Sequence, residues 1–151
     1  MGLDMYLYKK TYVKQWDHIK PDDQFQVTVT RGGETYDNIK PQRVTFITEE
    51  VGYWRKFNAL HNWFVTECAD GVDECQEIWV TRDNFEQLQE ILHKIQLDNS
   101  LADELLPTTD GFFFGGTEYG EYYFEQVAKT LELIEQILAE ETGDFYYRAS
   151  W

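Results

Sequence analysis

The stretch GLDMYLYKK, residues 2–10, alternates apolar and polar side chains over most of its length. Leu3, Met5 and Leu7 fall on one side of an extended chain, and the residues between them fall on the other. A period of two is typical of a strand that buries one face and leaves the other in solvent. The stretch therefore predicts a half-buried β-strand near the start of the chain, and the rest of the sequence must supply the layer that covers it.

Four further stretches have the alternation, or the β-branched and aromatic content, of strands. They are residues 25–30, 43–50, 75–81 and 144–151. The first two flank a segment that contains Gly32, Gly33 and Pro41, which favour turns. These two strands are therefore expected to pair with each other as a hairpin with a long loop.

Helices are predicted where apolar residues recur every three or four positions. They are expected over residues 51–68, 83–96 and 119–141. Asp83 with Glu86 has the spacing of a capping box at the start of the second helix. Strands and helices together predict an α+β fold, a single domain over residues 1–151. We expect an antiparallel or mixed sheet with about three helices packed on one face.

The charge balance limits the classes of partner. The chain has 28 acidic and 13 basic side chains, so its net charge is −15. Direct nucleic-acid binding is not expected, because it needs a basic surface. The charge suits plain solubility or a basic partner surface. No apolar run approaches the ~20 residues of a membrane span, and the start of the chain lacks the pattern of a signal peptide. A cytoplasmic protein without a membrane partner is expected.

Residues with reactive side chains are few and scattered. Cys68 and Cys75 are expected to be free thiols. Three scattered histidines give no metal-ligand spacing, so no metal site and no cofactor are predicted. Cys75, His61 and Asp73 have the residue types of a nucleophilic constellation, but no nucleophile-elbow pattern is present. A small hydrolase is therefore the least favoured of three functional hypotheses, behind two kinds of binding protein.

The first predicted helix carries an unusual set of polar side chains. Trp54, Asn58 and His61 form a second stripe beside its apolar face, with Arg55 and Asn62 one residue round. Asn is a poor helix former, so two of them indicate that a side-chain amide is needed there. Two interpretations stay open. The amides and the imidazole either hydrogen-bond a neighbouring strand or loop, or they recognise a ligand, with Arg55 supplying positive charge.

The stretch LPTTDGFFFGGTEYG, residues 106–120, sets three phenylalanines between glycines. In an extended chain, Phe112 and Phe114 share one face and Phe113 takes the other. The three rings therefore cannot all serve one purpose. One set is expected to pack in the core, and the other is expected under a helix or at the surface, where an aromatic face can stack on a planar group.

The glycines of this stretch precede the last predicted helix. Backbone N–H groups at a helix start can bind an anion. Glu118 and Glu121 already complement the helix dipole at this position, and they would repel a phosphate. The sequence therefore argues against an anion there, unless Arg55, Lys56 or Arg148 lies close by.

Several blocks of the chain resemble a family of small phage and prophage proteins. The blocks are MGLDMYL at 1–7, YWRKFNALHNWFV at 53–65, GVDEC at 71–75, LPTTDGFFFG at 106–115 and YY ahead of an acidic helix. They occur in order along nearly the whole chain. The chain departs from the usual form of the family at Phe57, Asp110 and Gly120. The resemblance implies a phage accessory protein, located in the host cytosol, that acts by binding. Such proteins inhibit host proteins or sequester nucleotide signals of host defence.

These observations combine into one leading hypothesis, a non-catalytic binding protein for a small planar or nucleotide-like ligand. The predicted ligand-binding residues are Trp54, Arg55, Asn58, His61, Asn62, Thr108, Thr109, Phe113 and Tyr119. The site requires the polar helix face and the glycine-rich loop to meet in space. The alternative is an acidic protein that docks on a basic host protein and inhibits it. The sequence leaves the oligomeric state open, a homo-oligomer included.

Overall fold

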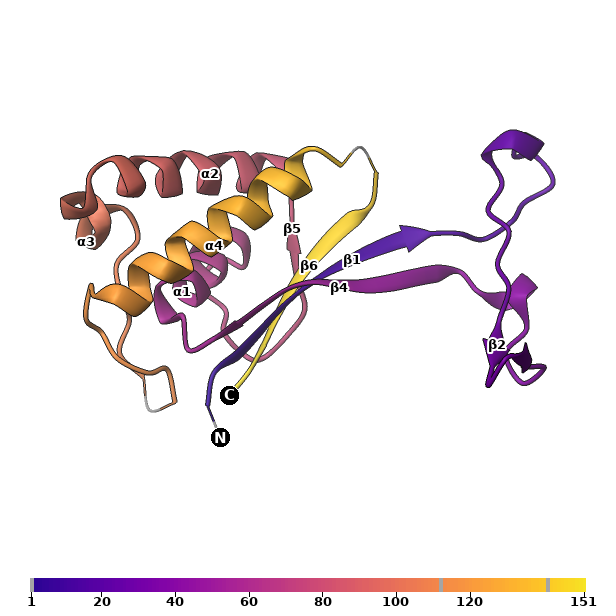
Figure 1. Cartoon of the computed structure of the whole chain (residues 1–151), viewed down its shortest axis with the longest axis horizontal. Helices are drawn as coiled ribbons and strands as arrows, with labels where there is room; N and C mark the ends of the chain where they lie inside the picture. Colours follow the sequence, from indigo (N-terminus) through magenta and orange to yellow (C-terminus); the bar gives the residue numbers. More distant parts are fainter. Residues whose placement is uncertain (1, 112, 141) are drawn as a thin grey trace.

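The computed structural model describes residues 2–111, 113–140 and 142–151, and these residues form an α+β fold (Figure 1). Its main sheet has the strand order β4-β1-β6-β5, and every pairing is antiparallel. The strands are β1 (Asp4–Tyr12), β4 (Phe46–Arg55), β5 (Ile78–Val80) and β6 (Asp144–Ser150). The fold class expected from the sequence is confirmed, and the sheet is of the antiparallel kind.

β1 lies inside the sheet, between β4 and β6, which confirms the strand predicted for residues 2–10. Leu3, Met5 and Leu7 are fully buried, whereas Asp4, Tyr6 and Tyr8 remain partly accessible. The alternation in the sequence therefore reports a sheet that is covered on one face. The strands predicted near the middle and the end of the chain are present as β5 and β6, with shorter bounds.

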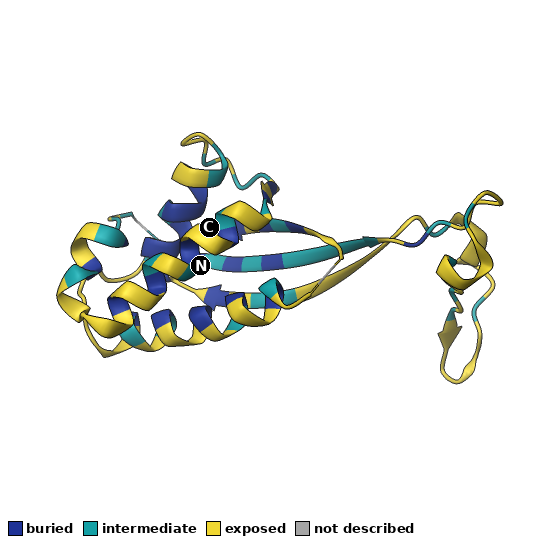
Figure 2. Ribbon diagram, turned by 90° about the horizontal axis from the view of Figure 1, so that it is seen from above, coloured by how far each residue is buried: buried dark blue, intermediate teal, exposed yellow. Residues whose placement is uncertain are grey.

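Helices cover the buried face of the sheet (Figures 1 and 2). They are α1 (Asn58–Cys68), α2 (Arg82–Leu97), the short α3 (Ala102–Leu105) and α4 (Glu121–Leu138). Side chains on the covered face of the sheet reach each long helix: Tyr147 stacks on α1, Phe145 packs against α2, and Trp54 donates a hydrogen bond to α4. No helix among the described residues is long and apolar enough to cross a membrane.

The prediction that the first helix begins at residue 51 is wrong. Residues 51–55 continue β4 instead, and α1 begins only at Asn58. In this strand Trp54 is buried, whereas Tyr53 and Arg55 point to the other face. There they donate hydrogen bonds to the Asp4 carboxylate over 2.6 and 2.8 Å. Pairing with the neighbouring strand β1 therefore outweighs the helical spacing of the aromatic residues.

The hairpin predicted from residues 25–30 and 43–50 is also wrong. The second stretch contributes to β4, which pairs with β1, and residues 25–29 form no strand. Only the two-residue strands β2 (Thr30–Arg31) and β3 (Glu34–Thr35) form there, around the Gly32-Gly33 turn. The physical reason is that, among the described residues, none of the helices and no strand of the main sheet packs over this segment. Figure 1 shows it extending away from the body of the protein.

One smaller expectation is corrected at the start of α2. The helix is capped by Thr81, whose hydroxyl accepts a hydrogen bond from the Asn84 N–H, and not by Asp83 with Glu86. Beyond α2 the chain stays mostly helical: the 3-10 turn η3 (Asn99–Leu101) leads into α3, and Leu106 beyond it is buried. The glycine-rich loop therefore starts from a fixed point in the core.

Candidate functional site

The start of α1 and the glycine-rich loop meet, as the predicted site requires. Asn58 is 2% exposed, and its Nδ2 donates to the carbonyl oxygens of Phe114 and Gly116 over 3.0 and 2.8 Å. Its Oδ1 accepts a hydrogen bond of 2.8 Å from the Thr109 N–H. The amide is thereby fully engaged by the backbone. Asn58 positions the loop, and its polar atoms are not free for a ligand.

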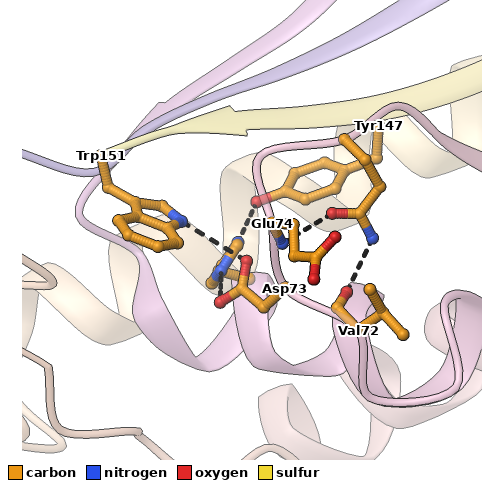
Figure 3. Close-up of polar contacts among 7 residues, drawn as sticks. Val72, Asp73, Glu74, Tyr147 and Trp151 are labelled. Carbon is orange, nitrogen blue, oxygen red and sulfur yellow. Dashed lines mark hydrogen bonds and ion pairs between the residues drawn. The ribbon is translucent and has the colours of Figure 1, made fainter.

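His61 is likewise engaged within the protein. Its Nδ1 lies 2.6 Å from the Tyr147 hydroxyl, and its Nε2 lies 2.9 Å from Asp73 Oδ2. Figure 3 shows this chain of contacts continuing to Trp151, whose Nε1 donates to Asp73 Oδ1. Burial raises the pKa of Tyr147 well above its ordinary value. The imidazole therefore ties α1 to β6 and to the loop before β5.

The nucleophilic constellation is only half assembled. The structure brings His61 and Asp73 together, but Tyr147 takes the other ring nitrogen, which a thiol such as Cys75 would need. The side chain of His61 is 2% exposed, so a substrate has no access to it in this state. This arrangement is suited to holding three elements together rather than to activating a thiol.

Trp54 and Asn62 do not join the site. The Trp54 ring is 1% exposed on the covered face of β4, and its Nε1 donates to Thr130 Oγ1 of α4 over 2.8 Å. Asn62 is half-buried on α1 and does not line the clefts described below. The prediction for Trp54 depended on a helix at residues 51–57. In the strand that forms instead, its side chain points into the core.

A cleft of about 590 Å³ opens between the end of β4, the glycine-rich loop and the start of α4. Its lining residues are Arg55, Lys56, Gly115, Gly116, Glu118, Gly120, Glu121, Tyr122 and Tyr123. A much smaller recess shares several of these residues and reaches Asn58 and Thr108. Arg55 is thus the one predicted residue that lines the large cleft, and Asn58 and Thr108 lie at its edge.

Backbone hydrogen bonds fix the walls of this cleft. The Lys56 N–H donates to the Leu3 carbonyl over 2.8 Å, and the Leu3 N–H donates to the Phe113 carbonyl over 2.9 Å. The Tyr122 hydroxyl donates to the Arg55 carbonyl. The loop and the end of β4 are therefore connected through the main chain of Leu3, and α4 joins them through the Tyr122 side chain.

Glycine is required at one position of this wall. Lys56 and Gly115 both have a left-handed backbone, with φ of 54° and 86°. A Cβ atom added to Gly115 would lie 3.0 Å from the Cβ of Lys56. Because a side chain at Gly115 would be strained and would also press on Lys56, only glycine lets the loop approach the turn this closely.

Charge in the cleft is mixed. Arg55 pairs with Asp4 over 2.8 Å. A hydrogen bond from Tyr53, together with the positive charge of Arg55, holds the pKa of Asp4 below its usual value. Lys56 has no ion pair among the described residues. The Glu118 carboxylate lies directly against Gly116, and Glu121 lies at the first position of α4. The cleft thus presents both cations and carboxylates.

The loop itself is not a strand. Phe113 and Phe114 lie in a turn, and Phe112 lies outside the described residues, so the expected sharing of faces does not apply. Within the loop the Thr108 N–H donates to the Tyr119 hydroxyl over 3.0 Å. Tyr119 packs edge-on against Tyr123. Thr108 and Tyr119 therefore brace the loop behind the cleft.

The sequence analysis allowed for an anion at the start of the last helix only if Arg55, Lys56 or Arg148 lay close to it. Arg55 and Lys56 do lie there. The predicted site missed the other eight lining residues, Lys56 and Tyr122 among them, because their neighbours include the end of β4, which the sequence pattern had assigned to a helix.

Comparison with protein-family models, with curated protein sequences and with solved structures gives no significant match. The resemblance to phage proteins accordingly stays a prediction from the sequence blocks. Within the described residues no group of three or more His, Cys, Asp and Glu side chains is placed to hold a metal ion. The function is therefore argued from the cleft.

Proposed function

We propose that the protein binds a small nucleotide-like anion in the cleft at the start of α4 and does not transform it. The observation that carries the proposal is the position of Arg55 and Lys56, which line a cleft together with three glycines in a chain of net charge −15. Two adjacent cations beside exposed backbone are the usual elements of a phosphate contact.

Lys56 is the stronger of the two anchors. It has no ion pair among the described residues, whereas Arg55 already contacts Asp4. The N-terminus of α4 adds a favourable dipole for negative charge, and Gly115, Gly116 and Gly120 let a ligand approach the backbone closely. A singly charged phosphate group fits this arrangement.

The carboxylates in the cleft restrict the class of anion that can bind. Glu118 and Glu121 would repel a polyphosphate, but their carboxylates accept hydrogen bonds from hydroxyl and amino groups. Tyr122 is half-exposed at the same cleft and offers a ring face for stacking. Sugar hydroxyls, a planar base and one phosphate charge together describe a cyclic nucleotide, because the phosphate monoester of a nucleoside monophosphate carries nearly two charges at neutral pH.

The resemblance to phage accessory proteins supports a biological role of the same kind. A protein that binds a nucleotide signal without turnover sequesters it, and this would serve counter-defence in the host cytosol. The alternative, docking on a basic host protein, would use the acidic surface rather than the cleft. Salt concentration distinguishes docking on a host protein from ligand binding in the cleft. Contacts between exposed charges of two proteins weaken sharply as ionic strength rises.

The proposal is tested by titrating the protein with nucleoside monophosphates and cyclic nucleotides in a calorimeter. Binding by at least one of them is expected. The variant Lys56→Asn keeps a residue that tolerates the left-handed backbone and removes the charge. It should weaken binding about 10- to 100-fold, which corresponds to ~1.5–3 kcal/mol for a hydrogen bond to a charged group.

The matched control is Lys94→Asn, which removes the same charge from the outer surface of α2, far from the residues of the cleft in sequence. It should leave the dissociation constant unchanged within about twofold. Absence of heat and of any thermal shift with every nucleotide, in protein that is folded by circular dichroism, would rule the proposal out.

A further inference from the structure

The segment that extends from the body lacks a core of its own. We call residues 13–45 the arm; the structure describes all of them, and Val13 is the only one that is buried. The arm contains two-residue strands and two 3-10 turns, and Figure 2 shows it almost entirely exposed beyond the end of the sheet. A two-stranded hairpin without a covering layer is marginally stable in water.

Apolar side chains are concentrated in the arm and at its base. Trp16, Phe25 and Ile39 are 45%, 50% and 47% exposed. At the base, where β1 and β4 leave the body, the rings of Tyr12 and Phe46 pack against each other at 5.2 Å and are also exposed. Covering these side chains with another molecule would remove apolar area from water.

The body offers a second apolar surface, on the face of the sheet opposite the helices. We call it the open sheet face; it consists of Tyr6, Tyr8, Tyr53, Trp79 and Tyr146. Trp79 is 59% exposed. Because side chains alternate along a strand, Tyr12 lies on the same face of β1 as Tyr6 and Tyr8. The aromatic residues of the open sheet face and of the base of the arm therefore lie on one face of the sheet, with Lys10 between Tyr8 and Tyr12.

The accessible surface of the chain is larger than that of a compact protein of the same mass. The accessible area is 9683 Å² for a mass of 18.0 kDa. A compact protein of this mass exposes about 8,000 Å², so the chain carries roughly 1,600 Å² in excess. A stable interface buries about 800 Å² on each partner. The excess is about twice the area that one partner contributes to such an interface.

Charge favours contact through the arm. Residues 13–45 carry five basic and five acidic side chains, so the whole net charge of −15 lies outside the arm. Two bodies repel each other, whereas a neutral arm can approach the body of a second copy without that cost. On the open sheet face Lys10 is paired with Glu77 and lies over the ring of Tyr146. Arg148, opposite Tyr6, and Glu50, opposite Tyr8, add one charge of each sign to this face.

We propose that two copies of this chain form a dimer in which the arm of each lies across the open sheet face of the other. A twofold axis that runs parallel to the open sheet face and perpendicular to the strands, near the base of the arm, reverses the long axis of one copy. It thereby places each arm over the partner's body, and both surfaces are covered in one self-complementary contact. The partner is a second copy because each chain carries both surfaces in one molecule.

The proposal is tested by analytical ultracentrifugation across protein concentrations. The wild-type chain should sediment as a dimer. Trp79→Glu on the open sheet face and Phe46→Glu at the base of the arm should each shift it to a monomer, because a charge would be buried in the contact. The control is Leu97→Glu at the end of α2, which is 89% exposed outside both surfaces and should leave the dimer intact.

Circular dichroism melts of all variants separate loss of the dimer from loss of the fold, since both substituted side chains are exposed. A wild-type chain that stays monomeric at every concentration contradicts the proposal and leaves the surface for a different partner. A dimer that persists in folded Trp79→Glu contradicts it as well, because the open sheet face would then not be the contact. A dimer lost only on Phe25→Glu would instead indicate contact between two arms.

Discussion

At the scale of single residues, internal hydrogen bonds account for two polar side chains of α1. Asn58 and His61 are unusual on a helix, and both are polar groups in an apolar surrounding. The structure shows that their partners are backbone groups, Tyr147 and Asp73. A buried polar group has to be paired, and the partners lie far away in sequence. The residue type therefore indicates that a hydrogen bond is needed, but it does not identify the partner.

The role of Asn58 gives a stability prediction. Asn58→Ala leaves two carbonyls and one N–H of the glycine-rich loop unpaired. An unsatisfied buried polar group costs about 1–3 kcal/mol, so the free energy of unfolding should fall by at least ~2 kcal/mol in urea titrations. Asn62→Ala, on the same helix and only half-buried, should cost less than ~1 kcal/mol. Equal losses for the two variants would contradict the positioning role of Asn58.

Cys68 gives a prediction about pH. Burial raises the pKa of its thiol from 9.0 to about 12. Between these values the unfolded chain releases the proton and the folded chain keeps it, so stability falls as pH rises from about 9 to 12. Cys68→Ala should flatten part of this fall. The measurement is the urea unfolding free energy at several pH values in that range, under reducing conditions. Identical pH dependence in both proteins would contradict the assignment.

At the scale of elements, the spacing of apolar residues correctly predicted the strands and helices that have one face covered by the core. β1, α2 and α4 each present one apolar face to the same core, so their period survives in the sequence. The wrong predictions concern segments that have no covered face or whose spacing of apolar residues is ambiguous. The arm has no covering layer, and residues 51–57 have aromatic spacing that suits a helix while their backbone pairs with β1. The cleft depends on this second segment, which is why only its cations could be anticipated.

The start of α2 provides a test at this scale. The Thr81 hydroxyl caps the helix by accepting from the Asn84 N–H over 3.1 Å, and the Asn84 side chain accepts from the Thr81 N–H. Thr81→Ala should lower the free energy of unfolding by about 1 kcal/mol. Glu86→Gln removes only a surface pair with Arg82 and should cost about 0.5 kcal/mol or less. The reverse order would favour the cap expected from the sequence.

At the scale of the whole molecule, three regions have different physical characters. The body is acidic and well packed around one core. The arm is neutral and has almost no buried side chain. The cleft is the place where two cations meet exposed glycine backbone. Lys56→Asn and Trp79→Glu act on the cleft and on the open sheet face, so the loss of ligand binding and the loss of the dimer can be measured separately.

The central claim, that the cleft at the start of α4 binds the ligand, is tested most directly by hydrogen–deuterium exchange. The protein is compared with and without the nucleotide that binds most tightly in calorimetry. We expect slower exchange in residues 113–122 and at the Arg55–Lys56 turn, with the arm unchanged. Protection that appears in other elements and leaves these two segments as they are would contradict the claim.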